Sequence, residues 1–268
     1  RAGIDNRVAE LCDSDVAAFA LTVAGAILWR GAKVGRLLSG DRLLSPQVEA
    51  LASDLLDPPR RERVRRRLAE WTHAHVRKVL APLVAGAEAK ASGPVRGLLY
   101  RLAESLGSAP RRGLRAAIDS LTRPERQEVA RLGVVLGRRH VFIPALLEAE
   151  ALRVRATLFQ VRHPRATPLP TGPVSLRAGG PADPDRDAAC GYESLGGLLV
   201  RVDAVENLLG TAHAQARQGQ LQASPSLARI LRCAPEALPS VLLALGFEKA
   251  GEGFRAREPR PKRKSPSV

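Results

Sequence analysis

Six arginines fall within eight residues in the first third of the chain. They are Arg60, Arg61, Arg63, Arg65, Arg66 and Arg67. A guanidinium group presents its N–H donors in a planar fork that matches the oxygens of a phosphate, so the cluster suits a nucleic-acid backbone. The alternative is a solvated surface in which Glu62 and Glu70 form ion pairs with these arginines. The sequence leaves both interpretations open.

Further basic residues extend the candidate phosphate-binding set. Two arginine pairs lie near expected turns or helix starts, two arginines lie in an expected hairpin, and a basic run ends the chain. These residues are Arg111, Arg112, Arg138, Arg139, Arg255, Arg257, Lys262, Arg263 and Lys264. The run at the end is expected to anchor a polyanion without regard to its sequence. The candidate nucleic-acid-binding residues are these together with Arg60, Arg61, Arg63, Arg66 and Arg67.

The sequence contains no motif of a catalytic or nucleotide-binding site. The GxxxxGK[ST] phosphate-binding loop and the GxSxG nucleophile motif are both absent. His73 and His75 are the only close histidine pair, and helical residues at this spacing point about 200° apart, so they do not share a metal ion. We therefore expect no catalytic residue, no metal ligand and no cofactor site in this chain.

The overall charge also favours a polyanionic partner. The 42 basic residues, of which six are lysine, exceed the 27 acids and give a formal net charge of +15. A coding bias toward arginine would explain the scarcity of lysine, but it does not explain the excess of positive charge. A charge of this size attracts nucleic acids over long distances.

The cysteines and the apolar runs indicate where the protein acts. Cys12, Cys190 and Cys233 are widely separated and form no CxxC pair, which predicts neither a disulfide framework nor a zinc site and fits the reducing cytoplasm. No apolar run reaches membrane-spanning length, and no signal peptide precedes the chain's first element. Because the chain begins at Arg1 and contains no methionine, we expect it to be a piece of a longer polypeptide.

The first elements that would position these side chains are predicted to be strands. Short apolar runs broken by glycine at residues 19–22, 26–30 and 33–38 predict a three-stranded β-meander in a segment of residues 1–42. Ser45 followed by a proline is typical of a helix start.

Residues 43–163 are predicted to form a helical domain that carries the arginine cluster. A long helix is predicted after Pro58, with an apolar stripe at spacings of three and four. The stripe consists of Val64, Leu68, Trp71, His75 and Val79. Further helices are predicted at Ser92 and at Thr122, where Glu125 completes a capping box. Glycine and arginine between two apolar runs predict a β-hairpin over residues 134–143.

The C-terminal part has a different pattern. Residues 164–190 hold six of the 20 prolines and predict an exposed linker. Residues 191–258 then predict a strand, three helices and a hairpin, which is the order of a winged helix. Asp203 and Glu206 are expected to form a capping box, and residues 259–268 a basic disordered tail. The predicted fold class is mainly α, with a small N-terminal β-meander, a helical accessory domain and a C-terminal winged-helix-like domain.

The third helix predicted in the winged-helix-like domain, residues 235–245, does not suit base recognition. It contains no Lys, Arg, Asn or Gln, which are the side chains that contact base edges in the major groove. Glu236 and Ser240 are its only polar residues. A sequence-specific transcription factor is therefore disfavoured, and we expect this helix to pack within the fold or to contact a protein.

Several segments of the chain, in order, resemble one family of helicases. They are Phe19 and Leu21 with ILWRGAKVGR at 27–36, RRERVRRRL at 60–68 with Trp71, GPVRGL at 93–98 with LG at 106–107, GVVLGR at 133–138, HVFIPALL at 140–147, GY at 191–192, LVRVD at 199–203 and LPSVLLALGF at 238–247. On these segments the chain resembles the C-terminal accessory region of bacterial superfamily II (DEAD/DEAH-like) helicases similar to the mitochondrial degradosome ATP-dependent RNA helicase. The resemblance covers nearly the whole chain and is poorest in the predicted linker.

The resemblance implies that two RecA-like motor domains, which require ATP and Mg²⁺, lie upstream in the parent protein. It transfers no catalytic residue, because the motor motifs are absent here. The implied function is to guide single-stranded RNA for the motor, with structured RNA or DNA as alternative ligands. Two other functions stay open: an adaptor that docks a partner such as a ribonuclease through the winged helix, and a free-standing DNA-binding regulator.

Overall fold

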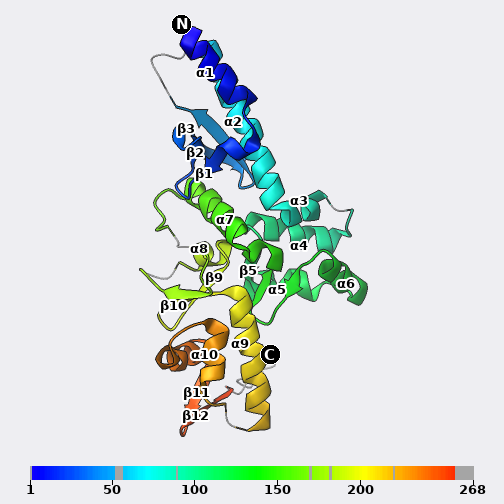
Figure 1. Ribbon diagram of the computed structural model, residues 1–268. Coiled ribbons are helices and arrows are strands. Elements are labelled where there is room, and N and C mark those ends of the chain that lie inside the picture. The colour runs from blue at the N-terminus through cyan, green and yellow to red at the C-terminus, as the bar shows by residue number, and fades with distance from the viewer. Residues whose placement is uncertain are drawn as a thin grey trace, which may run out of the picture. The chain divides into compact units, whose positions relative to one another are not determined.

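The computed structural model describes residues 2–51, 57–88, 90–168, 171–180, 183–219 and 221–256. Within these ranges the chain is mainly helical, as the sequence predicts, and its short strands form small sheets (Figure 1). Its contacts divide it into two compact units, Arg1–Gly172 with Asp183–Tyr192, and Pro173–Ala182 with Glu193–Val268. We call them unit 1 and unit 2.

Unit 1 begins with a helix and a four-stranded antiparallel sheet. The elements are α1 (Ala2–Asp13), the 3-10 turn η1 (Val16–Ala18), β1 (Phe19–Leu21), β2 (Ala26–Trp29), β3 (Ala32–Arg42) and β4 (Ser45–Ala50). The strands follow one another in the sheet in chain order, and the first three occupy the segments predicted as a meander. Ile27, Trp29 and Leu37 of the sheet are buried in one cluster with side chains of the following long helix.

The helix start predicted at Ser45 is wrong, because this residue begins strand β4. Buried and exposed side chains alternate along β4, with Pro46 and Val48 buried, and this period of two is that of a strand with one buried face. At Gly40 the two strands approach closely, since a Cβ there would lie 2.0 Å from the carbonyl oxygen of Ser45. The boundary predicted at residue 42 therefore falls inside a sheet.

Helix α2 (Pro58–Val79) carries the arginine cluster, and its apolar stripe fixes its orientation. Asp57 begins the helix by accepting the backbone N–H of Arg60 at 3.0 Å, and prolines occupy the first turn. The buried residues of α2 are Val64, Leu68, Trp71, Thr72 and Val76. The first three pack on the sheet, and α1 lies alongside the helix (Figure 1). This packing leaves most of the arginines on the remaining faces of α2.

The rest of unit 1 is a helical core with a small sheet. Its elements are α3 (Ala81–Glu88), α4 (Gly93–Glu104), β5 (Ser108–Pro110), α5 (Arg111–Asp119), α6 (Arg123–Arg131), β6 (Val135–Leu136), β7 (His140–Phe142), the 3-10 turn η2 (Pro144–Leu147) and α7 (Ala149–Arg162). The predicted hairpin is present as β6 and β7. Strand β5 pairs with the other edge of β7, a pairing that the sequence pattern did not indicate.

The capping box predicted at the start of α6 is confirmed. The Thr122 hydroxyl accepts the N–H of Glu125, and the Glu125 carboxylate accepts the N–H of Thr122 at 2.8 Å. Ser92 precedes α4 as predicted, but its hydroxyl accepts no backbone N–H of α4 and instead donates to Glu125 at 2.7 Å. The same carboxylate therefore stabilises the start of α6 and ties it to the start of α4.

The segment predicted as an exposed linker is partly folded into the two units. Strand β8 (Ser175–Arg177) pairs with β10 (Leu198–Arg201) in unit 2, and the second half of α8 (Pro184–Ala189) is buried in unit 1. Arg155 of α7, which is fully buried, donates hydrogen bonds to the carbonyl of Ala189 at 3.0 Å. The prediction fails at α8 because the residue that fixes it lies on a helix distant in the sequence.

Unit 2 contains the strand, three helices and hairpin predicted for the C-terminal part. The predicted strand is β10, the three helices are α9 (Val202–Gln218), α10 (Pro225–Leu231) and α11 (Leu238–Ala244), and the hairpin is β11 (Phe247–Ala250) with β12 (Gly253–Ala256). Strand β9 (Tyr192–Leu195) precedes β10, and the 3-10 turn η3 (Pro235–Ala237) precedes α11. Leu221, between α9 and α10, forms a β-bridge with Phe254 of the hairpin.

The capping box predicted at Asp203 is wrong. Helix α9 begins at Val202, and the Asp203 carboxylate accepts hydrogen bonds from the guanidinium of Arg201 at 2.7 and 2.8 Å. The Arg201 guanidinium is a stronger donor than a backbone N–H, so the Asp203 carboxylate accepts from it and not from the start of the helix. The predicted basic tail lies outside the described residues.

Candidate nucleic-acid interface

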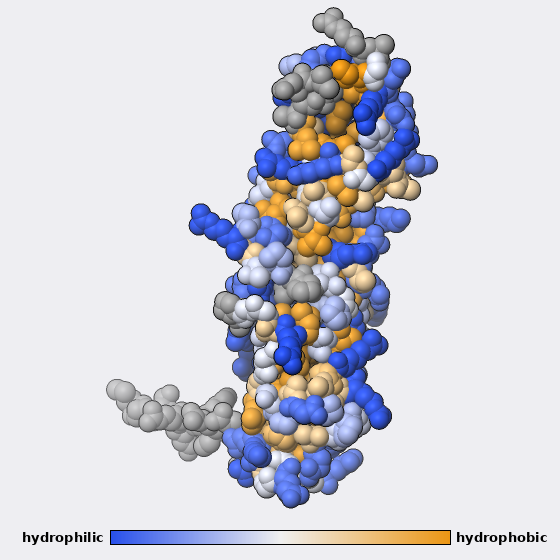
Figure 2. Space-filling view, turned by 60° about the vertical axis from the view of Figure 1, so that its left-hand side comes forward, coloured by the Kyte–Doolittle hydropathy of each residue, from blue (hydrophilic) through white to orange (hydrophobic). Residues whose placement is uncertain are grey.

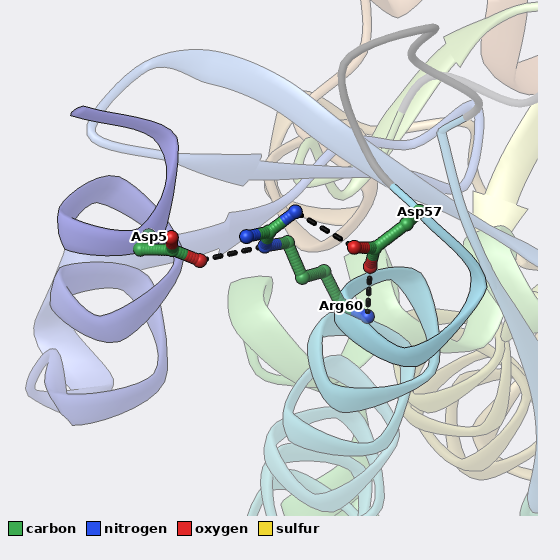
Figure 3. A network of polar contacts seen from close by, with 3 residues as sticks. All are labelled: Asp5, Asp57 and Arg60. Atoms are coloured by element: carbon green, nitrogen blue, oxygen red, sulfur yellow. Dashed lines mark hydrogen bonds and ion pairs between the residues drawn. The ribbon is translucent and has the colours of Figure 1, made fainter. Parts of the chain in front are cut away.

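Arg60 is held by two carboxylates at the start of α2. Its Nε donates to Asp5 of α1 at 2.6 Å, and its Nη1 donates to Asp57 at 2.7 Å (Figure 3). The hydrogen bond that Arg60 donates to Asp5 raises the pKa of Arg60 above its usual value. The positive charge of this arginine is therefore neutralised by two carboxylates of the protein itself, and its bond to Asp5 joins α1 to α2.

Arg65 is also paired with an acid. Its Nε and Nη2 donate to the two carboxylate oxygens of Glu62 at 2.7 and 2.6 Å, one helical turn away. The Arg65 hydrogen bond lowers the pKa of the Glu62 carboxyl. For this pair the solvated, ion-paired interpretation of the cluster is the better description.

Arg67 connects α2 to the segment before the sheet. Its Nε donates to the carbonyl of Cys12 at 3.0 Å, and its Nη2 donates to that of Ser14 at 2.7 Å. Its guanidinium carbon lies 5.1 Å from the ring centroid of Phe19, within cation–π range. Arg67, a predicted phosphate ligand, thus has a structural role at the end of α1.

Arg63 and Arg66 differ from these neighbours. Both side chains are exposed, and neither forms a hydrogen bond or an ion pair with any residue that the structure describes. They are three residues apart on α2, so both lie on the face turned away from the buried stripe of Val64 and Leu68. Arg61 is exposed as well. The structure therefore divides the predicted cluster into internally paired arginines and arginines that face solvent.

A second group of arginines is brought together by α5 and the β6–β7 turn. The backbone N–H of Arg111 donates to the carbonyl of Arg139 at 2.8 Å, and its Nη1 donates to that of Gly137 at 2.7 Å. These bonds fix the turn against the start of α5. Arg112 and Arg138 are exposed on either side of the contact, and Arg139 is half-buried. The two predicted pairs thus form one small basic cluster, in which Arg111 orients the turn.

Of the basic residues predicted to bind phosphate in unit 2, the structure describes Arg255. Arg255 of β12 lies 3.5 Å from the Glu248 carboxylate on β11, and both side chains are largely exposed. An exposed pair at this distance is weak, so Arg255 is accessible to a stronger anion. Arg257, Lys262, Arg263 and Lys264 lie outside the described residues.

The surface is a mixture of hydrophilic and hydrophobic side chains. On the face drawn in Figure 2, which is coloured by hydropathy, the two kinds are interspersed. A set of small basic clusters suits a flexible strand that touches the protein at several phosphates.

Comparison with protein-family models, with curated proteins and with solved structures finds no match for this chain. Among the residues that the structure describes, there is no group of side chains suited to a metal ion and no helix long and apolar enough to cross a membrane. The chemistry of the described side chains is therefore the evidence for function.

Unit 1 also contains an open cleft of about 810 Å³ that nothing in the sequence pattern indicated. Its walls come from the end of α4, from β5, from the end of α7 with residues 163–166, and from α8. The polar side chains that line it are Glu104, Ser105, Ser108, Arg162, His163, Arg165, Asp183 and Asp185. The segments that form the cleft are distant in sequence, so no local motif could reveal it.

Proposed function

We propose that this chain is the nucleic-acid-binding accessory region of an ATP-dependent RNA helicase, and that it guides single-stranded RNA to a motor formed by upstream RecA-like domains. The observation that carries the proposal is the exposure of Arg63 and Arg66 on one face of α2 without a hydrogen bond or salt bridge to an acid among the described residues. A guanidinium with free donors beside others that are already paired is suited to an external phosphate. The net charge of +15 and the helicase-like segments support the same conclusion.

The binding is expected to depend on phosphates and not on base sequence. Helix α11 takes the place of the recognition helix if unit 2 is a winged helix, an interpretation that the order of its elements and the Leu221–Phe254 bridge support. A Cβ at Gly196 would lie 2.5 Å from the carbonyl carbon of Ser240, so the β9–β10 turn packs directly against the α11 backbone. This contact and the lack of basic side chains argue against insertion of α11 into a major groove.

The proposal places the catalytic chemistry in the parent protein. ATP and Mg²⁺ would be bound by the RecA-like domains, and this chain would contribute no ligand to either. We place the protein in the cytoplasm, where the three cysteines would stay reduced.

The test compares RNA binding by two charge-reversed variants of the chain. In R63E/R66E, the affinity for single-stranded RNA should fall more than about tenfold at 0.1 M salt. The control R30E/R36E changes the net charge equally, but both of its arginines are paired with acids on the protein surface. It should lose about threefold or less, because distant charges are screened. Equal losses in the two variants would contradict a role for the α2 face. Parallel titrations with single-stranded DNA and a duplex rank the three ligands.

The adaptor function stays as the alternative because α11 leaves Leu243 about half exposed, at 51%, in a helix without basic residues. Under that alternative, L243E would abolish binding of a ribonuclease partner and leave RNA affinity unchanged. Under the RNA-guide proposal, the α2 variant changes RNA affinity whether or not such a partner binds.

A further inference from the structure

The cleft of unit 1 is lined in part by carboxylates. Basic residues outnumber acids by 42 to 27, and many of the acids accept hydrogen bonds from an arginine. Glu104 and Asp185 are exposed at the cleft, and neither forms a hydrogen bond or an ion pair with a described residue. They are therefore available to accept N–H donors from a ligand.

The same cleft contains aromatic and cationic groups. The rings of Phe159 and His163 both line it, with centroids 4.5 Å apart and planes 32° from each other. Arg162 is fixed at the wall because its Nη1 donates to the Ser39 hydroxyl at 3.0 Å and to the Gly40 carbonyl at 2.8 Å. Arg165 is exposed and has no partner among the described residues.

These groups match the parts of a nucleotide. Aromatic rings at protein surfaces stack on unstacked bases of single-stranded RNA, and a guanidinium binds phosphate. Carboxylates accept hydrogen bonds from the amino group of a base such as cytosine. A cleft of about 810 Å³ is also within the usual size range of small-molecule sites.

We infer that this cleft binds one unstacked nucleotide whose base carries an exocyclic amino group. The base packs against Phe159 and His163, and its amino group donates to Glu104 or Asp185. The phosphate lies beside Arg165. That the nucleotide belongs to an RNA strand rests on the proposed function, because a free nucleoside monophosphate offers the same chemistry.

Cytosine and uracil differ at two neighbouring positions, the group on C4 and N3, which accepts a hydrogen bond in cytosine and donates one in uracil. The two bases have the same ring size, but cytosine has an amino donor where uracil has a carbonyl oxygen. A carboxylate attracts the first group and repels the second. One hydrogen bond to a charged acceptor changes affinity by roughly tenfold or more, so oligo(C) should bind about tenfold more tightly than oligo(U).

The experiment measures fluorescence anisotropy of the full chain with labelled RNA oligo(C) and oligo(U) of equal length. The variant E104Q/D185N keeps the size of both side chains and removes their charges, and it should bind the two oligomers equally. The control E236Q/E252Q removes two exposed acids of unit 2 and should keep the tenfold preference. Intrinsic tryptophan fluorescence verifies that unit 1, which contains the cleft, is folded in each variant, since Trp29 and Trp71 both lie there.

Calorimetric titration with CMP and UMP distinguishes the source of the nucleotide. Equal binding of oligo(C) and oligo(U) by the wild-type chain would overturn the cleft inference and leave the RNA-guide proposal intact. Binding of CMP in preference to UMP without RNA binding would overturn the RNA-guide proposal and support a site for a free nucleotide. Binding of neither oligomer and neither monophosphate would overturn both.

Discussion

Arg155 is the side chain whose removal should disturb unit 1 most. It is fully buried, no carboxylate of the described residues is bonded to it, and its N–H groups donate to backbone carbonyls and a hydroxyl. It bonds to Ala189 and Leu146 at 3.0 Å each, to Ala188 at 3.4 Å, and to the Ser108 hydroxyl. These bonds join α7, η2, β5 and α8, so the guanidinium holds four elements in place.

Two opposing effects determine the cost of an Arg155→Met change. Burial lowers the pKa of Arg155 to about 10, so the charged form is disfavoured in the folded state by roughly 3 kcal/mol, which methionine would recover. Methionine would leave the carbonyl oxygens of Ala189 and Leu146 and the hydroxyl oxygen of Ser108 without this donor, at about 1–3 kcal/mol each. The net effect should be a loss of about 3 kcal/mol in the free energy of unfolding.

Urea denaturation followed by tryptophan fluorescence measures this loss. Both tryptophans, Trp29 and Trp71, lie in unit 1, so the signal reports the unit that contains Arg155. With a slope of about 2 kcal/mol per M, the midpoint should fall by about 1.5 M. Arg153→Met, an exposed arginine on the same helix, is the control and should shift stability by less than about 0.5 kcal/mol. Equal midpoints for the two variants would refute the assigned role of Arg155.

Two further predictions concern single side chains. Arg67→Ala should lower the free energy of unfolding of unit 1 by about 1–3 kcal/mol, because two carbonyls lose a charged donor. The control Arg66→Ala should change it by less than about 0.5 kcal/mol. Urea midpoints measure both changes, and a larger loss in Arg66→Ala than in Arg67→Ala would contradict the roles assigned to the two arginines. The pKa of Glu125 is lowered in the folded state, mainly by the Thr122 backbone N–H and next by the Ser92 hydroxyl. The Glu125 carboxylate therefore stabilises the fold above the unfolded-state pKa of 4.5, and this contribution is lost as pH falls through the lower folded-state pKa. Midpoints measured between pH 7 and pH 3 should therefore fall less in Glu125→Gln than in the wild type, and parallel curves would contradict the capping interaction.

The sequence predicted those elements whose signals are local. The apolar stripe predicted from Val64 to Val79 and the capping box at Thr122 each lie within one helix. The capping box is present, and of the stripe Val64, Leu68 and Trp71 are buried, whereas His75 and Val79 are partly buried. Strand β4 was mistaken for a helix start because Ser45 with Pro46 fits the first turn of a helix, and its pairing with β3 depends on the close approach at Gly40. The pairing of β4 with the neighbouring strand, which the pattern of one segment does not contain, makes this segment a strand.

The same distinction applies to the candidate site. The sequence located the arginine cluster but could not sort its members, since the partners of Arg60 and Arg67 are Asp5, Cys12 and Ser14, far away in the chain. Nor could it reveal the cleft, whose walls come from four separate segments. Charge and spacing indicated the type of ligand, and the tertiary contacts indicated which side chains are available to bind it.

The salt dependence of RNA binding tests the central claim most directly. Each phosphate neutralised on a single strand contributes about −0.7 to the slope of log affinity against log salt. If Arg63 and Arg66 each neutralise one, the slope of the variant R63Q/R66Q should be shallower than that of the wild type by about 1.4. Its affinity at 0.1 M salt should then be about 25-fold lower, and the difference should vanish near 1 M. An unchanged slope in a folded variant would contradict the claim that this face of α2 binds the RNA backbone.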